Sequence, residues 1–344
     1  MKIFYAVQAT GNGHVSRAME MLPYLQNYGD VDVFLSGSNC NLKMNANVQY
    51  RSKGMSLFYS GNGGLNYSRM ITDIAPLRIL KEVKNLPVEN YDLVLNDFES
   101  ITALACAYKK VKSVNVGHQA SFMSENTPRP KNKNFMGELI LKNYARASKY
   151  VGFHFDSYDD FILPPVIKKE IWNAEPKTLE HITVYLLSFS DEVVYRKLSN
   201  FKDYRFEVFS KEVKTITQKG NITFIPVDKV EFNKSLINCT AIITGAGFET
   251  PAEALYLDKK IMVIPVKGQY EQQCNAAALQ KFNVVCINNF AEEFDAAFPK
   301  WISNDDQLKV NYTKDTRAIV ASMMQIALHH AAESQPAFGK LMWE

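Results

Sequence analysis

The sequence predicts an α/β fold of two Rossmann-like domains that face each other across a cleft. Short apolar runs alternate with helical patterns along the 344 residues, which is typical of parallel sheets covered by helices on both faces. The stretch "FILPPVIKKEI" (Phe161–Ile171) interrupts this alternation, because two prolines between extended apolar residues make a stiff connector. The alternation then restarts. Each half also carries a glycine-bearing turn between a strand and a helix, so we expect domains at residues 1–163 and 164–344.

The first half contains five apolar runs of strand length and two clear helical patterns. The runs lie at residues 2–7, 31–37, 91–98, 111–117 and 150–155, and the helical patterns lie at 15–28 and 99–109. Between the first run and the first helix is the turn "QATGNGHVSRA" (Gln8–Ala18). Ligands of open α/β sheets bind beyond the carboxyl ends of the strands, and this turn sits at such an end.

The second half repeats the pattern. Strands are expected at residues 181–189, 204–210, 221–226, 240–248 and 259–266, and helices at 191–201, 227–239 and 269–282. Residues 316–332 also have helical apolar spacing, and this last helix is a candidate to cross back to the N-terminal domain.

Composition excludes several classes of function. Apolar residues make up 47% and charged residues 22% of the chain, as in globular proteins, and a net charge of +3 without a nucleic-acid-binding motif argues against a nucleic-acid partner. The five cysteines (Cys40, Cys106, Cys239, Cys274 and Cys286) lack metal-ligand spacing, so we expect no metal and no bound cofactor. Their odd number suits a reducing compartment, and neither a signal peptide nor a membrane span is evident. We therefore expect a cytoplasmic protein.

The second glycine turn, "TGAGFETPAEAL" (Thr244–Leu255), has the form of a phosphate site. Gly245 and Gly247 end a strand and let backbone N–H groups approach a ligand, and the helix that follows presents its N-terminus. Two interpretations of Glu253 stay open. It closes a capping box, with Thr250 as N-cap and Pro251 as the first helical residue, or it reaches the ribose of a nucleotide.

A second segment, "QYEQQCNAAAL" (Gln269–Leu279), follows this turn. Together the two resemble the donor-binding signature of GT-B nucleotide-sugar glycosyltransferases, which in plants reads H-C-G-W-N-S-T-L-E, a strand ending in proline, and D-Q-x-x-N. The resemblance spans nearly the whole chain. It is closest to the bacterial branch that includes the family-28 UDP-N-acetylglucosamine transferase, and especially to family-1 proteins with a GFETPAEAL-type signature. It implies metal-independent, inverting transfer of a sugar from a nucleoside-diphosphate sugar, with UDP expected as the nucleotide.

The resemblance also implies the donor site. Glu253 would bind the ribose, Glu271 and Gln272 would contact the sugar hydroxyls, and Phe224 in "TFIPVD" would stack on the base, with Pro226 shaping the loop. The implied donor site comprises Phe224, Pro226, Gly245, Ala246, Gly247, Phe248, Glu249, Thr250, Glu253, Gln269, Glu271 and Gln272.

Three positions depart from the plant signature. Gly245 replaces a phosphate-contacting histidine, Glu249 replaces an asparagine, and Val227 replaces a glutamine. Glu249 is the most unusual of the three, because a carboxylate beside a diphosphate is unfavourable unless it points away or meets a cation.

The first glycine turn, "GNGHVSR" (Gly11–Arg17), lacks the third glycine of a dinucleotide fingerprint. In the resembled family this turn faces the acceptor and carries a histidine, here His14. Histidine suits the removal of a proton from an acceptor hydroxyl, although a histidine bonded to its own loop is the alternative.

Further polar residues follow the neighbouring strands. Asp97 is expected to orient the base, and His118 is the competing base. Acceptor or phosphate contacts are expected from Gly11, Gly13, Arg17, Glu99 and Gln119, with a solvated Arg17 as the alternative.

The acceptor is expected on the N-terminal domain, near Tyr59–Arg69 and His118–Asn134. Residues 1–165 carry more basic than acidic side chains, which suits a lipid-linked or glycan acceptor and peripheral contact with the inner membrane face. Two other functions stay open: a UDP-sugar 2-epimerase of the same fold, and a nucleotide-sugar-binding protein without catalysis.

Overall fold

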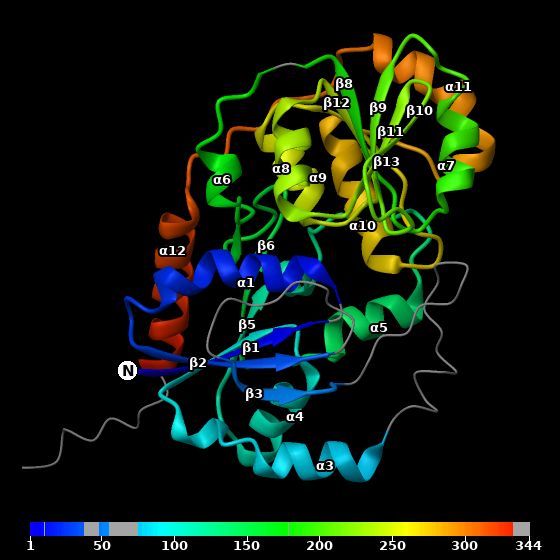
Figure 1. The fold of residues 1–344 in the computed structure, drawn as a ribbon. Helices are drawn as coiled ribbons and strands as arrows, with labels where there is room; N and C mark the ends of the chain where they lie inside the picture. The colour runs from blue at the N-terminus through cyan, green and yellow to red at the C-terminus, as the bar shows by residue number, and fades with distance from the viewer. Residues whose placement is uncertain (10, 38–47, 55–74, 178, 333–344) are drawn as a thin grey trace, which may run out of the picture.

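The computed structural model describes residues 1–9, 11–37, 48–54, 75–177 and 179–332 (Figure 1). Within these residues the chain forms two seven-stranded sheets, one from each half of the sequence. Helices cover both sheets, so the predicted α/β architecture of two Rossmann-like domains is confirmed.

All strand pairs of the first sheet are parallel, in the order β3-β2-β1-β4-β5-β6-β7. Its strands are β1 (Lys2–Gln8), β2 (Asp30–Ser36), β3 (Val48–Ser52), β4 (Leu93–Asp97), β5 (Val114–Gly117), β6 (Lys149–Phe153) and β7 (Ile162–Leu163). Its helices are α1 (Asn12–Leu25), α3 (Pro76–Asn85), α4 (Ser100–Lys109) and α5 (Phe135–Asn143), with 3₁₀ turns η1 (Val88–Asn90) and η2 (His118–Met123). The apolar run of β1 is buried after Lys2, as expected for a central strand.

The second sheet has the order β10-β11-β9-β8-β12-β13-β14, and only β10 runs antiparallel to its neighbour. Its strands are β8 (His181–Tyr185), β9 (Arg205–Ser210), β10 (Thr217–Lys219), β11 (Ile222–Pro226), β12 (Ala241–Thr244), β13 (Lys260–Val263) and β14 (Val285–Cys286). Its helices are α6 (Lys169–Trp172), α7 (Asp191–Leu198), α8 (Lys229–Asn238), α9 (Glu249–Tyr256), α10 (Tyr270–Leu279) and α11 (Phe290–Ser303), with the 3₁₀ turn η3 (Gln280–Phe282).

The proline-bearing connector is partly regular. It contains the extended strand β7 before the two prolines, as expected, and the short helix α6 after them, so a stiff extended connector was predicted correctly up to the prolines and wrongly from Lys169 on. The prolines themselves interrupt regular structure because they supply no backbone N–H. The predicted boundary after residue 163 falls between these two elements.

The C-terminal helix α12 (Thr316–Ala332) returns to the first domain, where it packs beside α1 (Figure 1). Ile319 and Met323 are fully buried on its inner face. At its start, Thr316 Oγ1 donates a hydrogen bond of 3.1 Å to the carbonyl of Ile167 in the connector. The two passages of the chain between the domains therefore touch each other.

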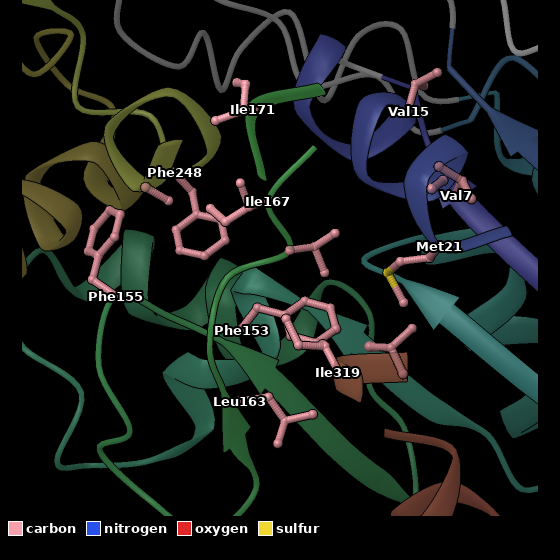
Figure 2. Close-up of a cluster of buried hydrophobic side chains, with 14 of the residues drawn as sticks. Val7, Val15, Met21, Phe153, Phe155, Leu163, Ile167, Ile171, Phe248 and Ile319 are labelled. Atoms are coloured by element: carbon pink, nitrogen blue, oxygen red, sulfur yellow. The ribbon is translucent and has the colours of Figure 1, made fainter. Parts of the chain in front are cut away.

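One apolar cluster runs through both domains (Figure 2). Phe248 from the second glycine turn packs against Phe155, which follows β6, with ring centroids 5.1 Å apart. Ile167 of the connector and Ile319 of α12 belong to the same cluster. Apolar burial, the main favourable term in folding, therefore also holds the second domain against the first.

Docking of the two domains also relies on a glycine of α5. A Cβ atom at Gly137 would overlap the ring of Tyr270 on α10, whose hydroxyl donates a 2.7 Å hydrogen bond to Glu138 Oε1. We expect Gly137→Ala to lower the free energy of unfolding by about 1–3 kcal/mol, because the tyrosine ring must leave its place. Urea unfolding measures the loss. Leu139→Ala, on the exposed side of the same helix, is the control, and equal stability of both variants would contradict the prediction.

Candidate functional site

His14 and Asp97 form a hydrogen-bonded dyad between α1 and β4. His14 Nδ1 lies 2.8 Å from Asp97 Oδ1. Strands β1 and β4 are neighbours, with Val7 paired to Asp97, so the residues that follow β1 lie beside the end of β4. A carboxylate only accepts, so His14 Nδ1 donates in its contact with Asp97, and Arg17 Nη2 lies 3.1 Å from the same nitrogen. The other ring nitrogen, Nε2, lies 3.5 Å from Gln119 Nε2. The His14 side chain is 14% exposed, whereas Asp97 is fully buried.

Arg17, one turn further along α1, binds the same carboxylate. Its Nη2 lies 2.8 Å from Asp97 Oδ1 and 2.9 Å from Oδ2, and its Nε lies 3.3 Å from Oδ2. The Arg17 side chain is 2% exposed, so the alternative of a solvated arginine is wrong. Burial by itself raises the pKa of Asp97, but the Arg17 charge and the hydrogen bonds from His14 and Arg17 outweigh it and hold that pKa below its usual value.

Glu249, the residue that looked unfavourable beside a phosphate, meets a cation. It is the first residue of α9, and its Oε1 forms an ion pair with Arg17 Nη1 across the domain interface. Its side chain is 17% exposed. Burial raises the pKa of Glu249 to about 7, with Arg17 opposing the shift and Glu253 adding to it.

Two glycines leave space for the polar cluster of His14, Arg17, Asp97 and Glu249. A Cβ at Gly117 would lie 2.7 Å from Asp97 Oδ1, and a Cβ at Gly13 would lie 3.2 Å from Glu249 Cγ. Gly13 thus admits a glutamate side chain of the other domain. Gly117 and the buried Tyr5, whose hydroxyl makes no hydrogen bond to the described residues, were not foreseen. Burial and the Asp97 carboxylate raise the pKa of Tyr5.

His118, the competing base, is buried between the two domains, which disfavours that role. Its Nδ1 lies 3.0 Å from the Phe153 carbonyl and its Nε2 lies 2.7 Å from Asn275 Oδ1, so both ring nitrogens are engaged. The ring is buried and stacks on Phe248 at 4.0 Å, and burial lowers the pKa of His118. The histidine instead docks the two domains. Asn275, which also donates a 3.0 Å bond to the Ala246 carbonyl, completes this contact.

The capping-box interpretation of Glu253 was wrong. Helix α9 begins at Glu249 with Phe248 as its N-cap, so Thr250 lies within the first turn and no side chain caps the helix. The Glu253 carboxylate is buried and accepts a 2.9 Å bond from Lys168 of the connector. Burial raises the pKa of Glu253, and Lys168 opposes the shift. The N-cap residue Phe248 stacks on the ring of His118.

The predicted base-stacking ring is not accessible. Phe224 is 2% exposed and lies in the apolar core of the second sheet, on the same face as Ile222. Successive side chains of a strand point to opposite faces, and Ile225 belongs to the other apolar cluster. The structure therefore contradicts a stacking role for Phe224. Pro226 is half-buried at the end of β11.

The other residues predicted to bind the donor lie around the turn after β12 and the start of α10. Glu271 Oε2 accepts a 3.1 Å hydrogen bond from Gln119 Nε2, which also lies 3.5 Å from His14 Nε2. Gln272 Oε1 accepts a 2.9 Å bond from the Val266 amide, so this side chain folds onto its own loop. Gln269 is the N-cap residue of α10. Ala246 is buried, whereas a Cβ at Gly247 would meet nothing within 4 Å, which leaves room for a ligand.

Two other expectations concern the acceptor side. Glu99 caps α4, accepting bonds from the amides of Ile101 (2.9 Å) and Thr102 (2.6 Å), so the structure contradicts a contact with acceptor or phosphate. Gly11 is the extended N-cap of α1. The segment Tyr59–Arg69 lies outside the described residues.

A search for metal sites within the described residues finds no group of three or more histidine, cysteine, aspartate or glutamate side chains that would hold an ion. In the same part of the chain, every helix is too short or too polar to span a bilayer.

Sequence comparison decides the family. The profile described as "Glycosyl transferase family 1" matches residues 1–298. The chain belongs to glycosyl transferase family 1. It is therefore a glycosyltransferase. No curated protein matches this glycosyltransferase in sequence.

Solved structures share the fold of this glycosyltransferase. The glycosyltransferase SnogD from Streptomyces nogalater is 13% identical, with a TM-score of 0.53 over 95% of this chain and 99% of that one. Phytolacca americana UGT2, solved with UDP-2-fluoro-glucose and pterostilbene, is 11% identical, with a TM-score of 0.60 over 96% and 98%. S. aureus MnaA, solved with UDP, is 12% identical, with a TM-score of 0.60 over 97% and 98%. These likenesses show the GT-B fold.

Proposed function

We propose that this glycosyltransferase moves a sugar from a UDP-sugar to an acceptor hydroxyl with inversion, using His14 as the general base. The observation that carries the proposal is the His14–Asp97 dyad. Its Nδ1 proton is held by the carboxylate at 2.8 Å, and the second glycine turn is docked beside it through Glu249 and Arg17. A base oriented by a carboxylate is the arrangement that activates a hydroxyl.

The reaction is a single displacement. His14 Nε2 takes the proton of the acceptor hydroxyl while its oxygen forms a bond to the anomeric carbon. The bond from that carbon to the diphosphate oxygen breaks, and UDP leaves with the electron pair. The first-turn N–H groups of α9 stabilise the developing negative charge, since a helix N-terminus favours anions. No metal ion or further cofactor takes part. Attack opposite the leaving group inverts the configuration.

The acceptor side suits a substrate at a membrane surface, lipid-linked or glycan in nature. Phe135, Met136 and Leu139 of α5 are exposed, and Lys131 and Lys133 precede them in the chain. Apolar side chains next to basic ones favour peripheral contact with anionic lipid. This placement corresponds to a protein of the cytoplasm that works at the inner membrane face.

Nucleotide release tests the function. The purified protein is incubated with UDP-, dTDP- and GDP-sugars, with and without a membrane-lipid or oligosaccharide extract as acceptor. We expect release of UDP that depends on the acceptor. Interconversion of UDP-sugars without acceptor would identify an epimerase instead. Binding of UDP-sugar without any turnover would identify a non-catalytic binding protein.

Removing the base gives a specific expectation. In the same assay, His14→Ala should lower kcat about 10²- to 10⁴-fold, because proton transfer from the acceptor loses its catalyst. Donor affinity, measured by calorimetry, should stay within about threefold, since His14 belongs to the acceptor half. His329→Ala, at an exposed position of α12, serves as the control. Equal rates for His14→Ala and wild type would exclude His14 as the base.

A further inference from the structure

A small cavity lies at the carboxyl ends of β8 and β9, on the same edge of the second sheet as the second glycine turn. Its volume is about 150 Å³. Strand β8 lies between β9 and β12, and the Gly245 amide donates a 3.4 Å hydrogen bond to the Tyr185 carbonyl at the end of β8. Neighbouring strands are about 4.8 Å apart, so the ends of β9 and β12 are about 10 Å apart. A ribose and a diphosphate can span that distance.

The walls of this cavity suit a flat ring. Leu186 and Val208 line it from the strands, and Val194 lines it from α7. The half-buried ring of Phe189 adds an aromatic wall and packs on Phe290, with ring centroids 5.1 Å apart. Sites for whole small molecules have volumes of about 300–1,000 Å³, so this cavity takes one part of a ligand. Its size favours the single ring of a pyrimidine over the double ring of a purine.

Asp191 gives the cavity a hydrogen-bonding side chain of one kind. Its Oδ2 accepts a 2.7 Å hydrogen bond from Ser210 Oγ, which in turn accepts one of 2.9 Å from the Glu212 amide. Ser210 is buried, so these bonds orient the carboxylate. Within the part of the chain that the structure describes, Asp191 Oδ1 has no hydrogen-bond partner. A carboxylate oxygen only accepts, so a ligand beside it must offer an N–H or O–H group.

We propose that this cavity binds the nucleobase of the donor and that Asp191 selects a pyrimidine with an N–H group at N3, namely uracil or thymine. The inference rests on the proposed function, in which the donor is a nucleoside-diphosphate sugar. It gives the base a site in place of Phe224, whose ring is buried in the core. Cytosine carries a lone pair at N3, which the Asp191 carboxylate repels. A site that hydrogen-bonds an N–H group rejects an analogue that lacks it.

Titration calorimetry of the full chain with UDP, dTDP, CDP and N3-methyl-UDP tests the proposal. We expect the wild type to bind UDP or dTDP at least about tenfold more tightly than CDP and N3-methyl-UDP, and the first two ligands distinguish uracil from thymine. Asp191→Asn should weaken binding of the preferred nucleotide about 10- to 100-fold. It should also abolish the preference over CDP, because its NH₂ group can donate to N3 of cytosine.

Two further variants separate contact with the base from effects on the fold. Glu192→Gln removes the neighbouring carboxylate of the first turn of α7, which is 80% exposed and paired with Arg196, and should bind all four nucleotides as the wild type does. Ser210→Ala removes the hydrogen bond that orients Asp191 and should weaken binding of the preferred nucleotide about threefold to tenfold. Thermal unfolding confirms that each variant is folded.

Three results would overturn the inference. The first is equal affinity of the wild type for UDP, dTDP and CDP. The second is an Asp191→Asn variant that keeps the wild-type preference, and the third is the same loss of binding in Glu192→Gln. A wild type that binds none of the nucleotides would overturn both the inference and the proposed function. Selective binding of UDP that depends on Asp191, without transfer of sugar to any acceptor, would support the inference and refute the proposed transfer.

Discussion

Replacing Asp97 by asparagine is expected to lower kcat about 10⁴-fold, because it forces His14 into the wrong tautomer. Arg17 places donors on both oxygens of Asp97, with two of them on Oδ2. An asparagine would therefore keep its oxygen toward Arg17 and turn its NH₂ group toward His14 Nδ1. The ring would accept there and carry its proton on Nε2, where it cannot accept the acceptor's proton. Steady-state transfer rates measure the effect.

Two checks accompany this prediction. Donor affinity should be preserved when it is measured well below the melting temperature, because Asp97 lies in the first domain, away from the second glycine turn that is proposed to bind the donor. Asp160→Asn, at an exposed loop position, removes a carboxylate elsewhere and should leave kcat unchanged. A decrease of less than tenfold for Asp97→Asn would show that the dyad is not the proton acceptor.

Arg17→Met is expected to lower the free energy of unfolding by about 3–5 kcal/mol, because it leaves the buried Asp97 and Glu249 carboxylates without their cation. In the wild type the lowered pKa of Asp97 stabilises the fold above the ordinary aspartate pKa, and this contribution is lost as the pH falls through the folded pKa. In the variant the carboxyls take up protons, so its deficit should shrink between pH 7 and pH 5. Urea unfolding at the two pH values measures this.

The control for Arg17 is an arginine with a similar partner at the surface. Arg196 forms an exposed ion pair with Glu192 one turn away, and such pairs contribute little to stability. Arg196→Met should therefore change the unfolding free energy by less than about 0.5 kcal/mol. If Arg17→Met matched Arg196→Met, the buried network would not stabilise the fold.

Much of the architecture follows from apolar runs in the sequence, but short or half-exposed elements do not. Strand β3 alternates partly buried with exposed side chains, and α5 exposes Phe135, so neither gives a clear pattern. For a strand covered on both faces, the sequence also does not show which side chains point to which face, because apolar side chains point both ways. Phe224 was assigned to the ligand for this reason, although it points into the core.

Some residues of the site could be predicted from the order of the strands, whereas others depend on how the domains dock. His14 and Asp97 were predictable because β1 and β4 are neighbours in a parallel sheet and the carboxyl ends of such strands gather at one edge. The Arg17–Glu249 pair, the His118–Asn275 contact and the start of α9 depend on how the two domains dock. Docking is set by side chains more than 100 positions apart in the chain, and no local pattern encodes it.

The contact between Thr316 and Ile167 has a consequence for motion. The chain crosses between the domains twice, and this hydrogen bond places both crossings at one spot. Because the two connections meet at one point, any movement of one domain relative to the other would be a rotation about that point. The second domain is thus kept at a high effective concentration beside the first. Contact between the two domains is an intramolecular event, so it does not depend on the concentration of the enzyme.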